Sequence, residues 1–146
     1  MGEGDDRDMP AHRRLAVRAS TTAILLSVKR VAVIGASCDP RKSGYKAVVA
    51  FGRQGYEVIP INPHESEIGG LQTYRSVLDV PGAIDLATIY VPPPKGLSVL
   101  AEVAEKRIPE VWLNPGAESP DLIQRARELG LEPIVACSIM AICETP

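Results

Sequence analysis

The chain has 146 residues, with 16 Lys plus Arg, 18 Asp plus Glu and a formal net charge of -2. This length has room for one domain, and 45% apolar with 23% charged residues is typical of a soluble globular protein. The near-neutral charge leaves no basic excess for a nucleic-acid backbone, and an aromatic content of 4% gives no stacking platform for single strands. A small-molecule binder or enzyme and a protein-interaction module remain.

Cysteine and histidine usage bears on metal binding and location. Cys38, Cys137 and Cys143 form no C-x-x-C pair, and His12 and His64 lie far apart, so no metal site is predicted. An odd cysteine count without a clear secretory signal predicts reduced thiols in a cytoplasmic protein. The longest apolar stretch, 134–143, is about half the roughly 20 residues that a membrane span needs. We interpret it as a core strand with its exit segment.

Residues 1–18 are predicted to be a disordered tail, and residues 19–146 a folded domain. The start is polar, contains Gly and Pro, and mixes acidic residues with Arg. Its acidic residues and the brief apolar run at 23–26 disfavour a targeting sequence. Ser20 or Thr21 is expected to cap a short helix that ends near Val28.

The first half of the domain is predicted to alternate strand and helix. Residues 31–34 form a buried strand that ends at Gly35. Ser43 is expected to cap a helix that Gly55 terminates in the left-handed conformation. Residues 57–61 form the second strand. The core face of the helix is expected to be Ala47, Val48 and Phe51.

The middle of the chain is predicted to be a short connection and a second strand–helix pair. Residues 72–74 are expected to form a brief edge strand, and 76–78 a helical turn. Residues 86–91 form the next central strand, which Pro92–Pro94 end. A helix is expected from Lys95. Its apolar positions recur at spacings of three and four: Leu97, Leu100, Ala101, Ala104 and Ile108.

The last part of the chain is predicted to hold two more strands and a helix. Residues 111–113 form a strand. Ser119-Pro120-Asp121 combines a cap, a first-turn proline and a first-turn acid, which indicates a helix that runs to Gly130. Residues 133–136 form the last strand.

This alternation predicts an α/β protein: a three-layer, Rossmann-like fold with a mainly parallel sheet of five or six strands and helices on both faces. In such a sheet, ligands bind beyond the carboxyl ends of the strands, where the strand order reverses. The functional residues are therefore expected in the loops after Ile34, Ile61, Val91 and Leu113.

The first of these loops, 35–44, has the features of an anion site. Gly35 permits close backbone approach, and the free amides at the start of the next helix attract negative charge. Side chains that would add phosphate donors are Ser37, Arg41, Lys42 and Ser43. The loop is longer than G-x-G-x-x-G, so it is not the usual dinucleotide fingerprint.

The second loop bears on the choice of nucleotide. It reads Asn62-Pro63-His64, where a dinucleotide-binding domain would place Asp or Glu on the ribose hydroxyls. A nicotinamide cofactor would thus lose its main specific contact. An NAD(P)-binding oxidoreductase domain stays an alternative, and a ligand-free protein-interaction module is a second one.

The third and fourth loops are rich in proline. Tyr90-Val91-Pro92-Pro93-Pro94-Lys95 gives stiff backbone without amides, which would offer a ligand a preformed apolar wall with exposed carbonyls. The alternative is that the prolines only end a strand and start a helix at Lys95. Asn114-Pro115-Gly116 has the same two interpretations, as a turn or as a ligand wall.

Taken together, these segments resemble a known family. Residues 31–37 (VAVIGAS), 41–43, 55–63 and 111–113 resemble the small single-domain coenzyme A-binding proteins. Residues 89–94 (IYVPPP) are similar to the corresponding segment in the coenzyme A-binding N-terminal domain of the succinyl-CoA synthetase α subunit. The resemblance extends roughly from Val28 to Glu144.

The resemblance implies coenzyme A as the ligand and assigns parts of it to these loops. Gly35, Ala36, Ser37, Lys42 and Ser43 would line the phosphate end, Asn62 and Pro63 the adenosine, and Tyr90, Val91 and Pro92 the nucleotide and the start of the pantetheine arm. The predicted binding set also includes Arg41, Asn114 and Gly116.

Two departures from the family pattern stand out. A lysine that follows the second strand in the synthetase is replaced by His64-Glu65-Ser66-Glu67, so Arg41 or Lys42 would have to supply the cation. Ser138 takes the place of a cysteine that is common in single-domain relatives, and Cys137 precedes it. The coenzyme A thiol could form a mixed disulfide with Cys38 or Cys137, whereas the alternative is that Cys137 is a small core residue.

No catalytic constellation is found, so no enzymatic activity is predicted. The synthetase uses a phosphorylated histidine on a second domain and a partner subunit, for which 146 residues have no room. His12 lies in the tail, and His64 has no evident partner. We therefore predict a carrier, sensor or regulatory module that binds coenzyme A or a short acyl-CoA, with no nucleic-acid or membrane partner and an open oligomeric state.

Overall fold

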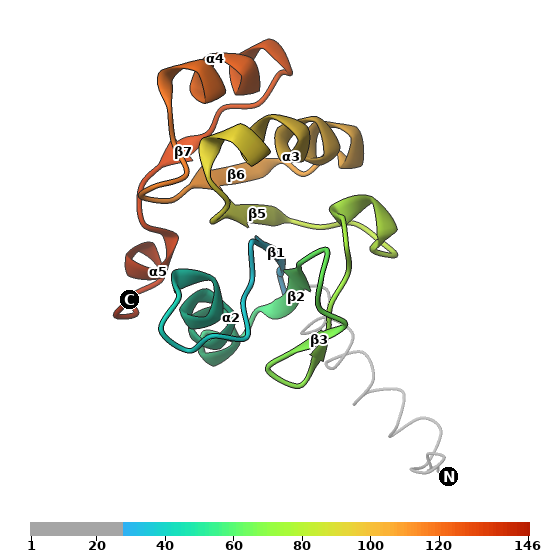
Figure 1. Cartoon of the computed structure of the whole chain (residues 1–146), viewed down its shortest axis with the longest axis vertical. Coiled ribbons are helices and arrows are strands. Elements are labelled where there is room, and N and C mark those ends of the chain that lie inside the picture. The colour runs from blue at the N-terminus through green and yellow to red at the C-terminus, as the bar shows by residue number, and fades with distance from the viewer. Residues whose placement is uncertain (1–27) are drawn as a thin grey trace, which may run out of the picture.

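A computed structural model describes residues 28–146 of the protein (Figure 1). The predicted tail, 1–18, lies outside the described residues, and so does the predicted helix after Ser20 or Thr21, except for Val28. Both stay predictions. No helix of the part described is long and apolar enough to cross a membrane.

A single parallel sheet of five strands forms the centre of the domain, in the order β2-β1-β5-β6-β7. The strands are β1 (Arg30–Ile34), β2 (Glu57–Ile61), β5 (Leu86–Ile89), β6 (Glu110–Leu113) and β7 (Ile134–Val135). A separate antiparallel hairpin joins β3 (Glu67–Ile68) to β4 (Leu71–Gln72). The predicted α/β class and parallel sheet are therefore confirmed.

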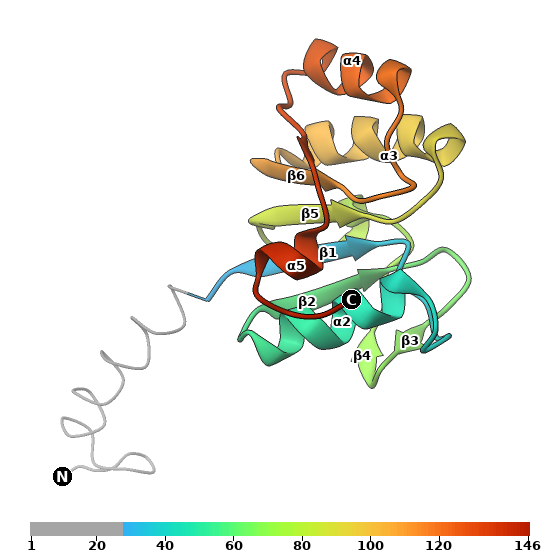
Figure 2. The same ribbon diagram turned by 90° about the vertical axis from the view of Figure 1, so that its left-hand side faces the viewer.

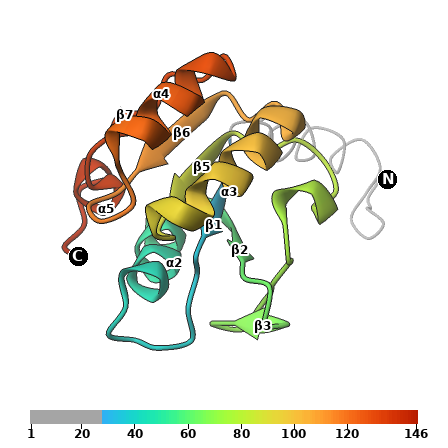
Figure 3. The same ribbon diagram turned by 45° about the horizontal axis from the view of Figure 1, so that its top comes forward.

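Helices cover both faces of the sheet (Figures 2 and 3). They are α2 (Ser43–Arg53), α3 (Pro93–Lys106), α4 (Pro120–Glu128) and the short α5 (Ser138–Ala141), with a 3-10 turn η1 (Val77–Asp79). Ala32 and Ile34 of β1 pack in one core with α3, α4 and η1, whereas Val31 and Val33 pack in the other with α2 and α5. Because both faces are buried, the central strands β1 and β5 are mostly apolar rather than alternating.

Two helix starts differ from the prediction. Ser43 does not cap α2: it is the first helical residue, Lys42 holds the cap position, and no side chain caps the helix. Helix α3 starts at Pro93 and not at Lys95, because the fixed φ of proline suits a first turn in which amides have no partner anyway. Ser119 does cap α4, accepting from the Leu122 amide at 3.1 Å as predicted.

The buried face of α3 is rotated from the one predicted. Gly96, Leu100 and Val103 are buried, whereas Leu97 is 48% exposed. A Cβ on Gly96 would stand 2.9 Å from the Leu122 side chain, so the missing side chain at Gly96 sets the contact between α3 and α4. The apolar spacing alone does not show this, because glycine carries no hydropathy signal.

The segments around residues 72 and 134 also differ from expectation. The strand predicted at 72–74 is a hairpin strand that ends at Gln72, and only Tyr74 touches the main sheet, by a parallel bridge to Ile61. The stretch 134–143 is not a core strand: Ile134 and Val135 form an exposed edge strand, and a helix follows from Ser138. Strand β5 ends at Ile89, two residues before the predicted end.

Candidate functional site

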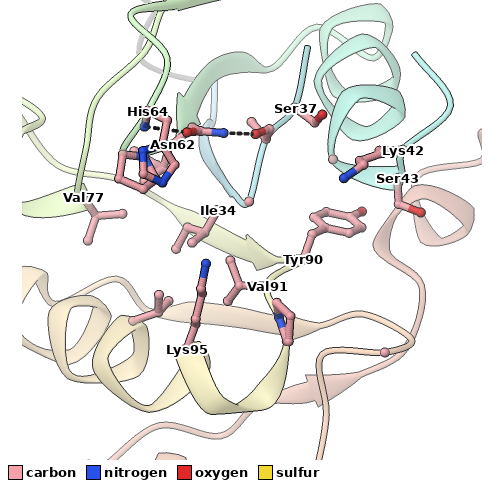
Figure 4. A pocket seen from close by; sticks show the side chains of 18 of the residues that line it. Ile34, Ser37, Lys42, Ser43, Asn62, His64, Val77, Tyr90, Val91 and Lys95 are labelled. Carbon is pink, nitrogen blue, oxygen red and sulfur yellow. Dashed lines mark hydrogen bonds between the residues drawn. The ribbon is translucent and has the colours of Figure 1, made fainter. Parts of the chain in front are cut away.

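A cavity of about 750 Å³ lies beyond the carboxyl ends of β1, β2 and β5, with residues of α2, α3 and η1 in its walls (Figure 4). Here the chain order reverses, since β1 continues to β2 on one side while β5 leads to β6 on the other. This is the position at which doubly wound sheets bind ligands. Twelve predicted binding residues line the cavity: Gly35, Ala36, Ser37, Arg41, Lys42, Ser43, Asn62, Pro63, Tyr90, Val91, Pro92 and Gly116.

The start of α2 is open to an anion. Among residues 28–146, the backbone amides of Ser43 and Gly44 donate to no protein acceptor, and the first turn contains no acid. The helix dipole and these two N–H groups therefore attract negative charge. Lys42, exposed at the cap, adds a cation.

Gly44 brings this helix start against the loop after β1. A Cβ on Gly44 would lie 2.1 Å from the Gly35 carbonyl oxygen, which leaves no room for any other residue. Gly35 itself has a φ of +93°, and a Cβ there would crowd Tyr90 and Val91 at 3.1 Å. Both glycines are thus required by close backbone packing at the cavity.

Asn62 ties two of the loops together. Its Nδ2 donates to the Ala36 carbonyl at 2.8 Å, and its Oδ1 accepts from the His64 amide at 2.7 Å (Figure 4). The amides of Gly35 and Ala36 both donate to the Ile61 carbonyl, at 3.1 and 3.3 Å. These backbone N–H groups therefore hold the loop against β2, and they do not point to a phosphate.

Arg41 is held by a carboxylate of its own loop. Its Nε and Nη2 donate to Asp39 at 3.0 and 2.9 Å, and the Arg41 amide donates to the same carboxyl at 3.0 Å. These hydrogen bonds lower the pKa of the Asp39 carboxyl. The Asp39 amide in turn donates to Ser37 Oγ at 3.0 Å. Because its guanidinium is already paired with Asp39, Arg41 has fewer free hydrogen-bond donors for a ligand than Lys42 has.

The start of α3 has the opposite character. Pro92 holds the cap position and Pro93 and Pro94 open the helix, so this turn has no free N–H groups. The Lys95 and Gly96 amides both donate to the Pro92 carbonyl, at 3.0 and 3.1 Å. The predicted amide-free wall is present, and the Lys95 side chain extends from it toward the cavity (Figure 4).

A buried polar network supports the wall from below. Ser138 Oγ lies 2.7 Å from Thr88 Oγ1 and 3.1 Å from the Tyr90 hydroxyl. Asn114 Nδ2 donates to Thr88 Oγ1 at 2.6 Å, and Asn114 Oδ1 accepts from the Ser138 amide at 2.8 Å. Burial raises the pKa of the Tyr90 hydroxyl.

This network corrects the role expected of Asn114. The side chain is 1% exposed and does not line the cavity, because its amide holds Thr88, Ile89 and Ser138. Ser138 is the centre of the network. Asn114 therefore anchors β5, β6 and α5, and its buried side chain binds these partners rather than facing the cavity.

The cysteines lie apart from the cavity lining. Cys38 is exposed, and Cys137 is half-buried against the core on the α2 side. Desolvation and the nearby Glu65 carboxylate raise the pKa of the Cys38 thiol, which disfavours its reactive thiolate form. The mixed disulfide stays a prediction, and intact mass after oxidation with coenzyme A would test it. In residues 28–146 no group of three potential metal ligands is found.

Sequence reasoning missed the part of the cavity beside α3. Arg75, Val77, Lys95, Ser98, Val99 and Glu102 all line it. Lys95 ends the proline-rich third loop, and no motif marks the other five. The only signal was helical: Lys95, Ser98, Val99 and Glu102 recur at spacings of three and four, which puts them on one face of the predicted helix.

A parallel sheet with a cavity of this kind at its switch point defines a nucleotide-binding α/β domain. The family model described as the CoA binding domain matches residues 29–143. The chain therefore belongs to this CoA-binding family, and the resemblance stated from the sequence is confirmed.

Individual relatives fall into two groups by length. The chain is 43% identical over 79 residues to the α subunit of ADP-forming acetate–CoA ligase II from Pyrococcus furiosus, covering 53% of this chain but only 17% of that protein. It is 29% identical over 113 residues to the uncharacterized protein YneT of Bacillus subtilis, covering 77% of this chain and 84% of YneT. The solved structure of a hypothetical protein from Pyrococcus horikoshii OT3 superposes with a TM-score of 0.74 at 27% identity, over 85% of this chain and 87% of that one.

Proposed function

We propose that this chain binds coenzyme A or a short acyl-CoA in the cavity and acts as a carrier, sensor or regulatory module, without ligase chemistry of its own. One observation carries the proposal. In a chain of the CoA-binding family, the open helix start with Lys42 faces an amide-free proline wall across one cavity. The charged part of one ligand fits the helix start with Lys42, and its uncharged part fits the proline wall.

The two sides match the two chemistries of coenzyme A. The pyrophosphate is a strong anion, which the amides of Ser43 and Gly44 and the Lys42 ammonium can bind. The pantetheine arm is thin and mostly apolar, and Val91, Pro92 and Pro115 line the cavity where it would leave the phosphates. A volume of about 750 Å³ lies within the roughly 300–1,000 Å³ of small-molecule sites.

The nicotinamide alternative has less support. A dinucleotide-binding domain needs a carboxylate on the ribose hydroxyls at the end of the second strand. Asn62 stands there, and both ends of its amide bind neighbouring backbone groups. Asn62 therefore does not replace the carboxylate that would accept hydrogen bonds from the ribose hydroxyls.

The role without chemistry is supported by the lining of the cavity. Among residues 28–146, the lining contains one histidine, His64, one carboxylate, Glu102, and no cysteine. No hydrogen bond joins a serine of the lining to either of them, so the described residues show no activated nucleophile. The ligase relatives are much longer chains, so any activity of the kind their names state would need parts beyond this domain.

Isothermal titration calorimetry with coenzyme A, acetyl-CoA and NADH tests the proposal. We expect a 1:1 complex with coenzyme A and a matching rise in the thermal unfolding temperature. No heat and no thermal shift at millimolar coenzyme A would refute it. Binding of NADH that coenzyme A does not displace would favour an oxidoreductase domain, and binding of neither would favour an interaction module.

A further inference from the structure

The α3-side half of the cavity, lined by Arg75, Val77, Lys95, Ser98, Val99 and Glu102, has a chemistry of its own. It combines cations, an apolar wall and one fixed carboxylate. Apart from Lys95, which ends the proline-rich third loop, none of these residues belongs to the loops that suggested coenzyme A from the sequence. The question is which part of a nucleotide they would contact.

Arg75 reaches the cavity because of an unusual backbone contact. Tyr74 forms an isolated parallel bridge with Ile61, the last residue of β2. The Tyr74 amide donates to the Pro60 carbonyl at 3.1 Å, and the Asn62 amide donates to the Tyr74 carbonyl at 2.9 Å. This short ladder places Arg75 beside the end of β2, where doubly wound sheets hold the ribose of a nucleotide.

The charge at this end of the cavity is positive. Arg75 and Lys95 line it, His64 faces it from the loop after β2, and Glu102 is the only carboxylate among the described residues of the lining. Within residues 28–146, neither Arg75 nor Lys95 forms a salt bridge. An unengaged guanidinium near a ribose favours a phosphorylated sugar, as arginine does for 2′-phosphorylated dinucleotides.

The rest of this half fits an adenine ring. Val77 is buried and Val99 is half-buried, and both belong to the apolar core beneath the cavity. Glu102 Oε1 accepts from Ser76 Oγ at 2.8 Å, which fixes the carboxylate. The described residues provide no donor for its second oxygen, which is therefore available to an amino group such as that of adenine.

We propose that the α3-side half binds the 3′-phosphoadenosine end of the ligand, and that Arg75 selects a ribose carrying a 3′-phosphate over one without it. This inference rests on the proposed function and adds the recognition of one phosphate to it. The guanidinium fork can donate two parallel hydrogen bonds to a phosphate, which a lysine cannot reproduce.

Calorimetric titration with coenzyme A and dephospho-coenzyme A tests the selection. For the unchanged protein we expect coenzyme A to bind at least about tenfold more tightly, as expected for hydrogen bonds to a charged group. Arg75→Gln should remove most of this ratio by weakening coenzyme A alone, and Arg75→Lys should restore only part of it. Arg125→Gln, on α4 and paired with Glu128, is the matched control and should leave the ratio unchanged.

The role of Arg75 and the binding of coenzyme A itself are tested by different outcomes. Equal affinity of the unchanged protein for both ligands, or an unchanged ratio in Arg75→Gln, would overturn the role of Arg75 while leaving coenzyme A binding intact. A protein that binds neither compound at millimolar concentration would overturn the proposed function itself. Circular dichroism of the exposed Arg75 variants provides the check that they are folded.

Discussion

Two helices begin at the cavity, and their first turns have opposite chemistry. Helix α2 starts with Lys42, Ser43 and Gly44, which present two free amides and a cation. Helix α3 starts with Pro92, Pro93 and Pro94, which present none. Both helix dipoles favour an anion, but only α2 has the N–H groups that would bind one directly.

This contrast between the two helix starts explains how one cavity can orient an asymmetric ligand. A helix dipole without free N–H groups attracts an anion only weakly. Free N–H groups beside a glycine, where the backbone is accessible, bind the anion at a defined position. The ligand's pyrophosphate is therefore expected at α2 and its uncharged arm along the proline turn that opens α3. Substitutions at each helix start test this contrast.

Gly44→Ala is expected to have the largest effect. Its Cβ would meet the Gly35 carbonyl oxygen at 2.1 Å, so the start of α2 must shift away from the loop. Overpacking of this kind costs about 1–3 kcal/mol of unfolding free energy, and the displaced amides should lose most coenzyme A affinity. Urea unfolding and calorimetry measure the two effects.

Gly52→Ala is the matched control in the same helix. A Cβ there meets nothing within 4 Å, so the protein should gain up to about 1 kcal/mol of stability and keep its affinity. Equal behaviour of the two variants would show that the close approach at Gly44 has no role.

Lys42→Ala should weaken coenzyme A binding by about 1–2 kcal/mol, since it removes a charge-assisted contact at an exposed site. Arg41→Ala should have a smaller effect, because Asp39 already occupies its guanidinium. Titrations at low and high salt should show a weaker salt dependence for the Lys42 variant. A larger loss in the Arg41 variant would mean that ligand binding breaks the pair with Asp39.

Tyr90→Phe tests the network under the proline wall. It should cost about 1 kcal/mol of unfolding free energy at neutral pH, through the lost hydrogen bond to Ser138. Because the pKa of Tyr90 is raised in the folded protein, its contribution is complete below pH 10.0, the ordinary pKa of tyrosine, and is lost as pH rises through the folded pKa.

Denaturant unfolding of both proteins between neutral pH and high pH measures this dependence. The gap in stability between the unchanged protein and Tyr90→Phe should narrow above pH 10.0. A gap that stays constant across that range would show that the Tyr90 hydroxyl ionises equally in the folded and unfolded chain.

Pro94→Ala should have the smallest effect. It adds an N–H to the first turn of α3 and loosens the unfolded chain, at a cost of about 0.4–1 kcal/mol of stability. Coenzyme A affinity should hardly change if the pyrophosphate lies at α2. Pro120→Ala, at the first residue of α4, controls for the general effect of a first-turn proline. A marked gain in affinity for the Pro94 variant alone would place the pyrophosphate at the first turn of α3 instead.

The sequence predicted the parts of the fold that are set by local pattern. Strand β2 was placed at its observed bounds, and the caps at Ser119 and Gly55 follow from local backbone needs. The glycine and proline motifs predicted the cavity residues that come from the loops after β1, β2 and β5. The position of Arg75 in the α3-side half could not be predicted. It depends on the bridge between Tyr74 and Ile61, which is a contact between distant segments that no periodicity in the sequence indicates.

Asn114 and Ser138 show a second limit of prediction from a single sequence. From the sequence, Asn114 belongs to a turn or a ligand wall, and Ser138 replaces a family cysteine. Their roles come from each other: the Asn114 side-chain carbonyl oxygen accepts from the Ser138 amide. Whether a polar residue after a strand faces a ligand or the core depends on which partners the fold brings within 3 Å. A single sequence does not contain that information.

The position of α5 has a consequence for how the domain folds. This helix packs on α2, and Gln54 Nε2 donates to Glu144 Oε2 at 2.6 Å across 90 residues of chain. Contacts between such distant segments require the closure of a long loop, and they typically form late. Ser138 and the Tyr90 hydroxyl meet only after this closure. The wall of the cavity is therefore expected to gain its final rigidity in the last folding step, after the sheet has assembled.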